Sequence, residues 1–216
     1  MFERNKIDKK KMANSKKFSV MDMEGVEFEK KLFIKQIAVR VFDANRNLLE
    51  EQGFVINTGG RLSWPIEMLK KFRFTELLTG VKWGWYDVPG FRTVSIEYAR
   101  SEVIRMLKNT IPFAKGIILE SQFLGACVIN NVTMTDSGIE INDIGSGFPT
   151  WNEYICKILG SVNKYCVEWS KIPKKWLSGK NQKLLKKYGF LPHHDPCLEC
   201  IYFQKLVLDN KLWEHL

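Results

Sequence analysis

The feature that most constrains this chain is a group of strand-like runs near its start. Residues 32–42 (LFIKQIAVRVF) are long, rich in β-branched residues and partly alternating, and shorter apolar runs occupy residues 18–22 and 54–57. Runs of this kind predict strands, and an Asn-rich turn signal separates the second from the third. The sequence therefore predicts a three-stranded antiparallel meander over residues 18–57.

The hydrophobic period then changes. Residues 96–108 place apolar side chains at helical spacing, and the run at 111–119 predicts a strand directly after this helix. A helix followed by a strand favours an α/β domain. We further expect a short strand, a loop and three helices, in that order, at residues 139–144, 145–149, 150–168, 181–188 and 197–209.

Length and composition agree with one globular domain. The chain has 216 residues, of which 45% are hydrophobic, so it can bury a core and is too apolar for a disordered protein. It has neither an apolar run of about 18 residues nor a signal-peptide core near the N-terminus, which predicts an intracellular protein, nuclear or cytoplasmic, without a membrane span. The five cysteines are an odd number, so a disulfide scaffold is not expected.

Basic residues are concentrated in two segments. The 33 Lys and Arg exceed the 24 Asp and Glu by nine, which favours a polyanionic partner, either a nucleic acid or an anionic membrane surface. Residues 1–17 predict a disordered basic arm ahead of a domain over residues 18–216. The second segment combines lysines with aromatic residues, as single-strand binding surfaces do. A solvent-exposed lysine face without a binding role would show the same pattern. Its candidate nucleic-acid-binding residues are Lys171, Lys174, Lys175, Trp176, Lys180, Lys183, Lys186 and Lys187.

Two acids end the first predicted strand, Asp22 and Glu24. Residues i and i+2 of a strand lie on the same face, so their carboxylates are aimed at one point. Such a pair repels unless a cation lies between the two groups, and oxygen ligands of this kind hold Mg²⁺. The pair therefore predicts a divalent metal site, although two acids at this spacing are common without one.

A histidine precedes a second acid near the start of the last predicted helix. His194 lies five residues before Glu199. A histidine at this place is a candidate general base that activates water beside a metal. The dipeptide Asp195-Pro196 has a structural explanation of its own, because Asp followed by Pro is a typical helix N-terminus.

Four segments, at residues 18–25, 77–81, 115–124 and 194–200, together resemble motifs of the DEDDh group of 3′–5′ exonucleases in the ribonuclease-H-like superfamily. Residues 18–25 (FSVMDMEG) resemble its first motif, and residues 194–200 (HDPCLEC) resemble its last, H-x4-D. Residues 115–124 (KGIILESQFL) resemble the middle motif, H-N-x-x-F-D-x-x-F-L, and residues 77–81 (LLTGV) resemble its T-G-I segment. The resemblance implies a ribonuclease-H-like α/β fold, with a mixed five-stranded sheet flanked by helices.

The same resemblance implies an active site and a reaction. Asp22, Glu24, Glu120 and Glu199 would hold two divalent ions, Mg²⁺ or Mn²⁺, and His194 would be the base for the water that attacks the terminal phosphodiester. The implied substrate is single-stranded RNA or DNA. Glu120 and Glu199 stand where the family has Asp, and the family's His-Asn pair in the middle motif is absent here.

A second family of the same superfamily is also similar. The Maelstrom domain carries a Glu-His/Cys-His-Cys zinc cluster, and Glu120, Cys166, His194 and Cys200 follow a comparable order, with Cys197 as a competing ligand. This alternative implies an inactive nucleic-acid-binding or interaction module stabilised by Zn²⁺. The intact pair of acids in the first strand favours the nuclease. A third possibility, an unrelated α/β protein, stays open at this point, as does the oligomeric state.

Overall fold

The computed structural model describes residues 16–57, 66–67, 70, 91–151, 153–154, 166–167, 191–192 and 195–216. The first three strands are β1 (Lys17–Phe28), β2 (Lys31–Asp43) and β3 (Leu48–Ile56). Each is antiparallel to the next, which confirms the predicted meander. β1 begins inside the segment expected to be the basic arm, and β3 begins six residues earlier than expected.

Further short strands complete a mixed sheet. β5 (Ile111–Ala114) lies parallel to β1, and β8 (Asn142–Asp143) lies parallel to β5. The strand order is β4-β3-β2-β1-β5-β8, with β6 and β7 off this path. The mixed α/β class is confirmed, but the sheet of the described residues has eight strands rather than five. The additional strands are three residues long, too short for a period to be visible in the sequence: β4 (Arg92–Val94), β6 (Cys127–Ile129) and β7 (Val132–Met134).

Two of the predicted helices are confirmed and one predicted strand is partly wrong. Helices α3 (Ile96–Leu107) and α7 (Pro196–Asp209) match their expected ranges closely. The run at 111–119 is a strand only as far as Ala114. Gly116 has a positive φ of 71°, which turns the chain, and α4 (Ile118–Leu124) follows. The helix then buries Glu120, Phe123 and Leu124 at helical spacing.

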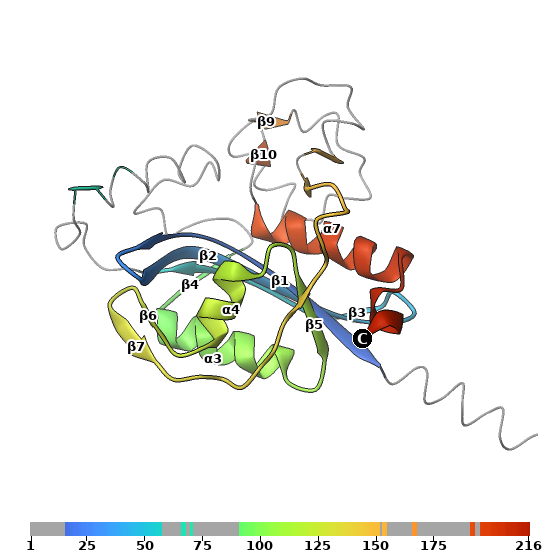
Figure 1. Ribbon diagram of the computed structural model, residues 1–216, viewed down its shortest axis with the longest axis horizontal. Helices are drawn as coiled ribbons and strands as arrows, with labels where there is room; N and C mark the ends of the chain where they lie inside the picture. Colours follow the sequence, from blue (N-terminus) through green and yellow to red (C-terminus); the bar gives the residue numbers. More distant parts are fainter. Residues whose placement is uncertain are drawn as a thin grey trace, which may run out of the picture.

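The helices cover both faces of the sheet. In Figure 1, α7 lies along one face, and α3 and α4 lie along the other. One core cluster packs Phe18 and Val20 of β1 against α7, and a second packs Met21 and Met23 against α3 and α4. Alternate residues of β1 therefore point into different cores, as a strand buried on both faces requires.

Other predictions fall mainly outside the described residues. The helix expected at 150–168 is described only near its start, and it does not continue to its predicted end, because Cys166–Val167 is strand β9, paired with β10 (Leu191–Pro192). The helix expected at 181–188 and the segment 77–81 lie outside the described residues. A 3-10 turn, η4 (Leu212–His215), follows α7. Within the described part of the chain, no helix has the length and apolar character needed to cross a membrane.

Candidate metal centre

The acidic pair of β1 lies on the face that α7 covers. Phe18 and Val20 point into the core under α7, so Asp22 and Glu24 continue the same face beyond it. A β-bulge follows directly, where the pairing with β2 shifts between Glu24 and Gly25. A Cβ on Gly25 would lie 2.5 Å from the carbonyl oxygen of Phe33. This close approach requires glycine, which explains why glycine directly follows the two acids.

Helix α7 brings a third carboxylate to this pair. Its N-cap is Asp195, whose side chain accepts hydrogen bonds from the backbone N–H groups of Cys197 (2.9 Å) and Leu198 (3.3 Å). Pro196 begins the helix, so the predicted Asp-Pro start is confirmed. Glu199 then lies in the first turn, where the helix dipole favours a negative charge.

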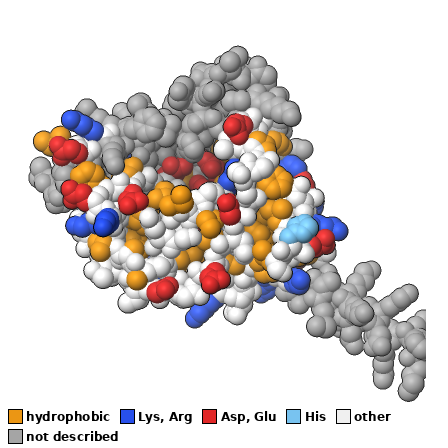
Figure 2. Space-filling view, viewed as in Figure 1, with side chains coloured by type: hydrophobic (Ala, Val, Ile, Leu, Met, Phe, Trp, Pro, Cys, Tyr) orange, Lys and Arg blue, Asp and Glu red, His pale blue; other side chains and the backbone are white. Residues whose placement is uncertain are grey.

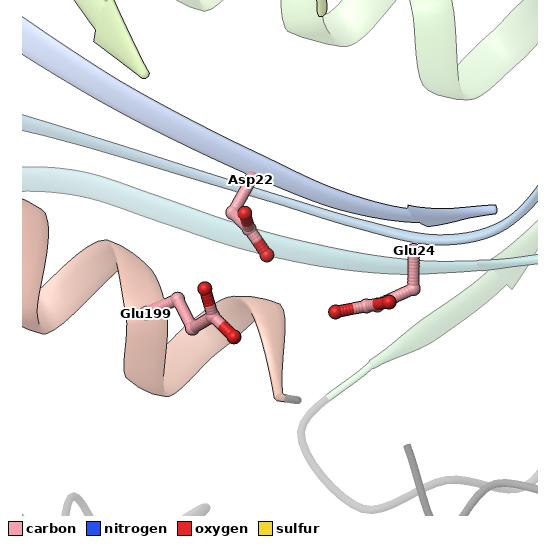
Figure 3. Close-up of side chains that lie close together, drawn as sticks. All are labelled: Asp22, Glu24 and Glu199. Atoms are coloured by element: carbon pink, nitrogen blue, oxygen red, sulfur yellow. The ribbon is translucent and has the colours of Figure 1, made fainter. Parts of the chain in front are cut away.

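Asp22, Glu24 and Glu199 form one cluster. Each offers a carboxylate oxygen within 4.8 Å of the other two. Figure 3 shows all three side chains reaching into the space between β1 and α7. Asp22 and Glu24 near the start of the sequence and Glu199 near its end are therefore neighbours in the fold.

Glu120 of α4 lies beside this cluster, although it is not one of the three clustered residues. Its side chain is buried, with 4% of its surface exposed. The end of α4 is held by the buried Arg100 guanidinium, which donates to the carbonyl oxygens of Phe123 (2.8 Å) and Leu124 (2.8 Å). The same group also bonds the carbonyl oxygen of Thr135 at 2.6 Å. These contacts set the position of the helix and, with it, that of Glu120.

All four acids line one pocket of about 440 Å³. It lies where the parallel pairing of β1, β5 and β8 ends, because Asp22 follows the paired residues of β1, Lys115 follows β5 and Asp143 ends β8. Ligands commonly bind at the carboxyl ends of parallel strands in α/β sheets. Figure 2 shows acidic side chains in a recessed area of this face. The lining also includes Lys115, Leu119, Asp143, Gly145, Ser146, Thr150, Trp151 and Phe203.

Burial and the charges of neighbouring acids disfavour the charged forms of Asp22, Glu120 and the N-cap residue Asp195. The pKa of Asp22 is raised well above its ordinary value, chiefly by burial and then by the charges of Glu199 and Glu24. Burial, with the charges of Glu24 and Glu199 adding to it, raises the pKa of Glu120 to about 8. Burial likewise raises the pKa of Asp195 to about 7. A cation in the pocket would reverse this effect.

The pocket fits divalent metal ions. The Oδ2 atom of Asp22 and the Oε2 atom of Glu120 are buried without a hydrogen-bond partner. An unpartnered buried carboxylate oxygen is costly, and metal coordination is one of the few ways to satisfy it. The donor set consists of oxygen atoms only, which Mg²⁺ and Mn²⁺ prefer. Glu24 and Glu199 would complete the ligand set.

The structure supports the alternative zinc set less well. The thiol of Cys200 on α7 is buried against the sheet, where it contacts the carbonyl oxygens of Ala38 (3.4 Å) and Val20 (3.8 Å). Cys200 does not line the pocket that contains Glu120, and burial raises the pKa of its thiol, which disfavours the thiolate that zinc requires. The side chains of Cys166 and His194 lie outside the described residues.

The remaining predicted site residues also lie outside the described part of the chain. This holds for His194 as base and for the whole lysine-rich surface, Lys171, Lys174, Lys175, Trp176, Lys180, Lys183, Lys186 and Lys187. Their roles remain predictions.

Two pocket residues were missed by sequence reasoning, Asp143 and Lys115. Asp143 ends β8, and its Oδ1 atom accepts hydrogen bonds from the backbone N–H groups of Gly145 (3.0 Å) and Gly116 (3.2 Å). An acid at the end of a short apolar run was visible in the sequence, as it was for Asp22. Lys115 had no such signal, because its role depends on a loop 30 residues later.

Known structures that resemble this chain include exonucleases of low sequence identity. Exonuclease I from Methylocaldum szegediense is 15% identical with a TM-score of 0.45, over 91% of this chain and 41% of the other. E. coli exonuclease I in complex with a dT13 oligonucleotide is 13% identical with a TM-score of 0.48, over 93% and 43%. A full-length 3′-exonuclease is 12% identical with a TM-score of 0.45, over 93% and 62%.

This chain therefore spans less than half the length of the two exonuclease I chains. No protein-family model matches the sequence, and no curated protein matches it.

Proposed function

We propose that this protein is a metal-dependent 3′–5′ exonuclease that acts on single-stranded nucleic acid, RNA or DNA. The observation that carries the proposal is the meeting of Asp22, Glu24 and Glu199 within 4.8 Å in a pocket that also contains Glu120. Five acids, these four and Asp143, in one partly buried pocket are unfavourable unless they serve a purpose that needs their charge. Hydrolysis of phosphodiesters with two bound divalent ions is such a purpose.

The four acids would hold Mg²⁺ or Mn²⁺ between the sheet and α7. Bound ions of this kind polarise a phosphate oxygen and lower the pKa of a water molecule. Asp22 and Glu24 project from the rigid centre of the sheet, so their oxygens need little reorganisation on binding. Glu199 and Glu120 approach from two different helices, so the ligand set is complete only in the folded domain.

His194 is the proposed general base. It directly precedes Asp195, the N-cap of α7, in the sequence. In this role it would take the proton from the attacking water as the bond to the terminal nucleotide breaks. The lysine-rich segment 171–187 would bind the phosphate backbone, so binding should weaken with increasing salt. A salt dependence that stays unchanged after several of these lysines are replaced would contradict that part.

The decisive experiment follows 5′-labelled and 3′-labelled single-stranded oligonucleotides, RNA and DNA in parallel, with Mn²⁺ or with EDTA. The protein is compared with Glu199→Gln, which removes one ligand charge at nearly constant volume, and with Glu140→Gln, an exposed acid outside the pocket. We expect metal-dependent shortening from the 3′ end by the wild type and Glu140→Gln, and a loss of about a hundredfold or more in Glu199→Gln.

Two results would overturn the proposed nuclease activity itself, and a third would overturn its direction. One is an absence of cleavage of every substrate in Mn²⁺. The other is cleavage that Glu199→Gln retains in full, because the acids would then have no part in the reaction. The polarity of the products decides the direction, since removal from the 5′ end would exclude a 3′–5′ exonuclease.

A further inference from the structure

The loop after β8 forms one side of the acidic pocket. Gly145, Ser146 and Thr150 line the pocket together with the four acids. Trp151 and Phe203 add aromatic surface to the same lining. The pocket therefore combines a carboxylate part, suited to metal and phosphate, with an apolar and hydroxyl-bearing part, which suits a sugar and a base.

The side chain of Lys115 holds this loop. Its Nζ atom donates hydrogen bonds to the carbonyl oxygens of Gly145 (2.9 Å) and Phe148 (2.8 Å). The hydroxyl of Tyr202 on α7 donates to the next carbonyl oxygen, that of Pro149, at 2.8 Å. The loop is thus fixed on one side to Lys115, which directly follows β5, and on the other side to α7.

Both ends of the loop are also fixed. At its start, Asp143 accepts a hydrogen bond from the Gly145 N–H at 3.0 Å. At its end, Thr150 and Glu153 cap each other: the Thr150 N–H donates to the Glu153 carboxylate at 2.8 Å, and the Glu153 N–H donates to the Thr150 hydroxyl at 3.2 Å. This arrangement leaves Ser146 and Gly147 at the tip, where Ser146 faces the pocket.

The contacts of the Lys115 ammonium group are unexpected for a cation in an acidic pocket. It lines the same pocket as Asp22 and Glu120, yet among the described residues its ammonium group bonds two loop carbonyls and pairs with no carboxylate. A lysine paired with these acids would compete with a metal ion for them. Because it bonds the loop instead, Lys115 does not compete with a metal ion for Asp22 and Glu120, and it holds the loop in place.

We propose that the loop of residues 145–150, held by Lys115, binds the terminal nucleotide of the substrate strand. The inference rests on the proposed function and names the substrate subsite of that pocket. Lys115 is a positioning residue, which acts through the loop rather than on the reacting phosphate. The Ser146 hydroxyl is the loop group that would meet the nucleotide. A volume of about 440 Å³ falls in the range of pockets that hold one small ligand.

The test compares Lys115→Met with Lys115→Arg, and with Lys108→Met as the matched control at an exposed lysine outside the pocket. For oligonucleotide degradation, Lys115→Met should raise KM about tenfold and change kcat by less than about twofold, because two charge-assisted hydrogen bonds to the loop are lost. Lys115→Arg can still donate to both carbonyls and should restore most of the affinity. Lys108→Met should match the wild type.

Two measurements without catalysis separate this inference from the proposed function. In Mn²⁺, calorimetric binding of thymidine 5′-monophosphate should weaken about tenfold in Lys115→Met. Hydrogen exchange of residues 145–150 should be faster in that variant. If the wild type degrades no oligonucleotide, the proposed function fails, but these two results would still support the nucleotide subsite.

The inference itself is overturned by any of three results. The first is equal KM and equal nucleotide affinity in Lys115→Met and the wild type. The second is weaker binding with unchanged hydrogen exchange of the loop, because Lys115 would then contact the nucleotide directly. The third is an absence of nucleotide binding by the wild type.

Discussion

At the scale of single residues, the acids of the pocket work against the stability of the metal-free fold. Asp22 is almost fully buried, and its neighbours Glu24 and Glu199 carry the same charge. Removing water from a carboxylate and placing two others beside it both disfavour ionisation. Such an arrangement is typical of a functional site, where a stability loss is balanced by binding.

We expect Asp22→Asn to stabilise the metal-free protein and to abolish its response to metal. The amide keeps the size of the side chain and removes one of the clustered charges. At pH 8 in EDTA, the thermal midpoint should rise by about 2 °C or more, whereas Mn²⁺ should no longer raise it. Calorimetric scans with and without Mn²⁺ measure the thermal midpoint of the metal-free variant and its response to the metal. A variant that Mn²⁺ still stabilises as strongly as the wild type would show that Asp22 is not a ligand.

Gly25 is the second residue whose replacement has a clear expected result. In Gly25→Ala, the new Cβ would meet the backbone oxygen of Phe33, so the bulge or β2 must shift. We expect a loss of about 1–3 kcal/mol in the free energy of unfolding, together with weaker Mn²⁺ binding, since the bulge adjoins Glu24. Urea titration and calorimetry provide the two values.

Gly147→Ala is the matched control for stability, because a Cβ there has no atom within 4 Å. Its free energy of unfolding should stay within about 0.5 kcal/mol of the wild type. Equal stability of the two alanine variants would contradict the close approach at Gly25.

At the scale of elements, the geometry of the site depends on how α4 is held. The helix has only seven residues, and no side chain caps its N-terminus. A helix this short has little stability of its own. Its C-terminal carbonyl groups are instead satisfied by Arg100 of α3, a buried cation that bonds four backbone oxygens, of Phe123, Leu124, Gly125 and Thr135.

Arg100→Met should therefore destabilise the protein strongly. It retains much of the side-chain volume but leaves buried carbonyl groups without donors, which costs about 3 kcal/mol or more. Arg105→Met is the matched control on the same helix, because Arg105 is half exposed and forms surface ion pairs with Glu50 and Glu102. That change should cost at most about 1 kcal/mol. Denaturant unfolding of both variants tests the difference, and similar losses would contradict the role given to Arg100.

At the scale of the whole molecule, the sheet and the helices on its two faces gather acids of the described residues into one pocket, in a protein whose net charge is positive. The formal net charge is +9, yet the four acids converge on one pocket. Under the proposed function, the basic residues would attract the nucleic acid, and the acidic pocket would need cations before a phosphate could approach it. Binding of metal and binding of nucleic acid should therefore be coupled.

The raised pKa values predict how stability depends on pH. Burial in the folded protein raises the pKa of Glu120 from its ordinary 4.5 to about 8 and the pKa of Asp195 from its ordinary 3.8 to about 7. Between these values the folded protein holds protons that the unfolded chain has released, so the stability of the metal-free protein falls as pH rises from about 4 to 8. The thermal midpoint in EDTA should be about 5 °C or more lower at pH 8 than at pH 5.

Added metal should reverse this trend. Because metal binds the ionised acids, Mn²⁺ should raise the thermal midpoint more at pH 8 than at pH 5. Scanning calorimetry at both pH values, with EDTA or Mn²⁺, supplies the four midpoints. A metal-free midpoint that rises from pH 5 to pH 8 would mean that the buried acids do not control stability in this window.

Local pattern was enough to predict part of the fold and of the site. The strands around Asp22, the helix α3 and the Asp-Pro start of α7 all follow from period and capping, which act between residues close in sequence. The same local rule placed Asp22 and Glu24 on one face of a strand. The helix α4 was missed because three apolar residues in succession, Ile117–Leu119, fit a buried strand as well as a helix.

The sequence by itself thus determined which residues are paired locally: two acids on one strand face, and a third in the first turn of a capped helix. The resemblance predicted that Glu120 shares a site with these acids, but strand period and helix capping could not show it. The tertiary structure decided that the acids meet in one pocket and that Lys115 bonds a loop rather than a carboxylate. The physical reason is the range of the interactions. Strand period and helix capping depend on neighbouring residues, whereas burial, charge repulsion and the Lys115 contacts arise between segments far apart in the chain and exist only once the sheet has formed.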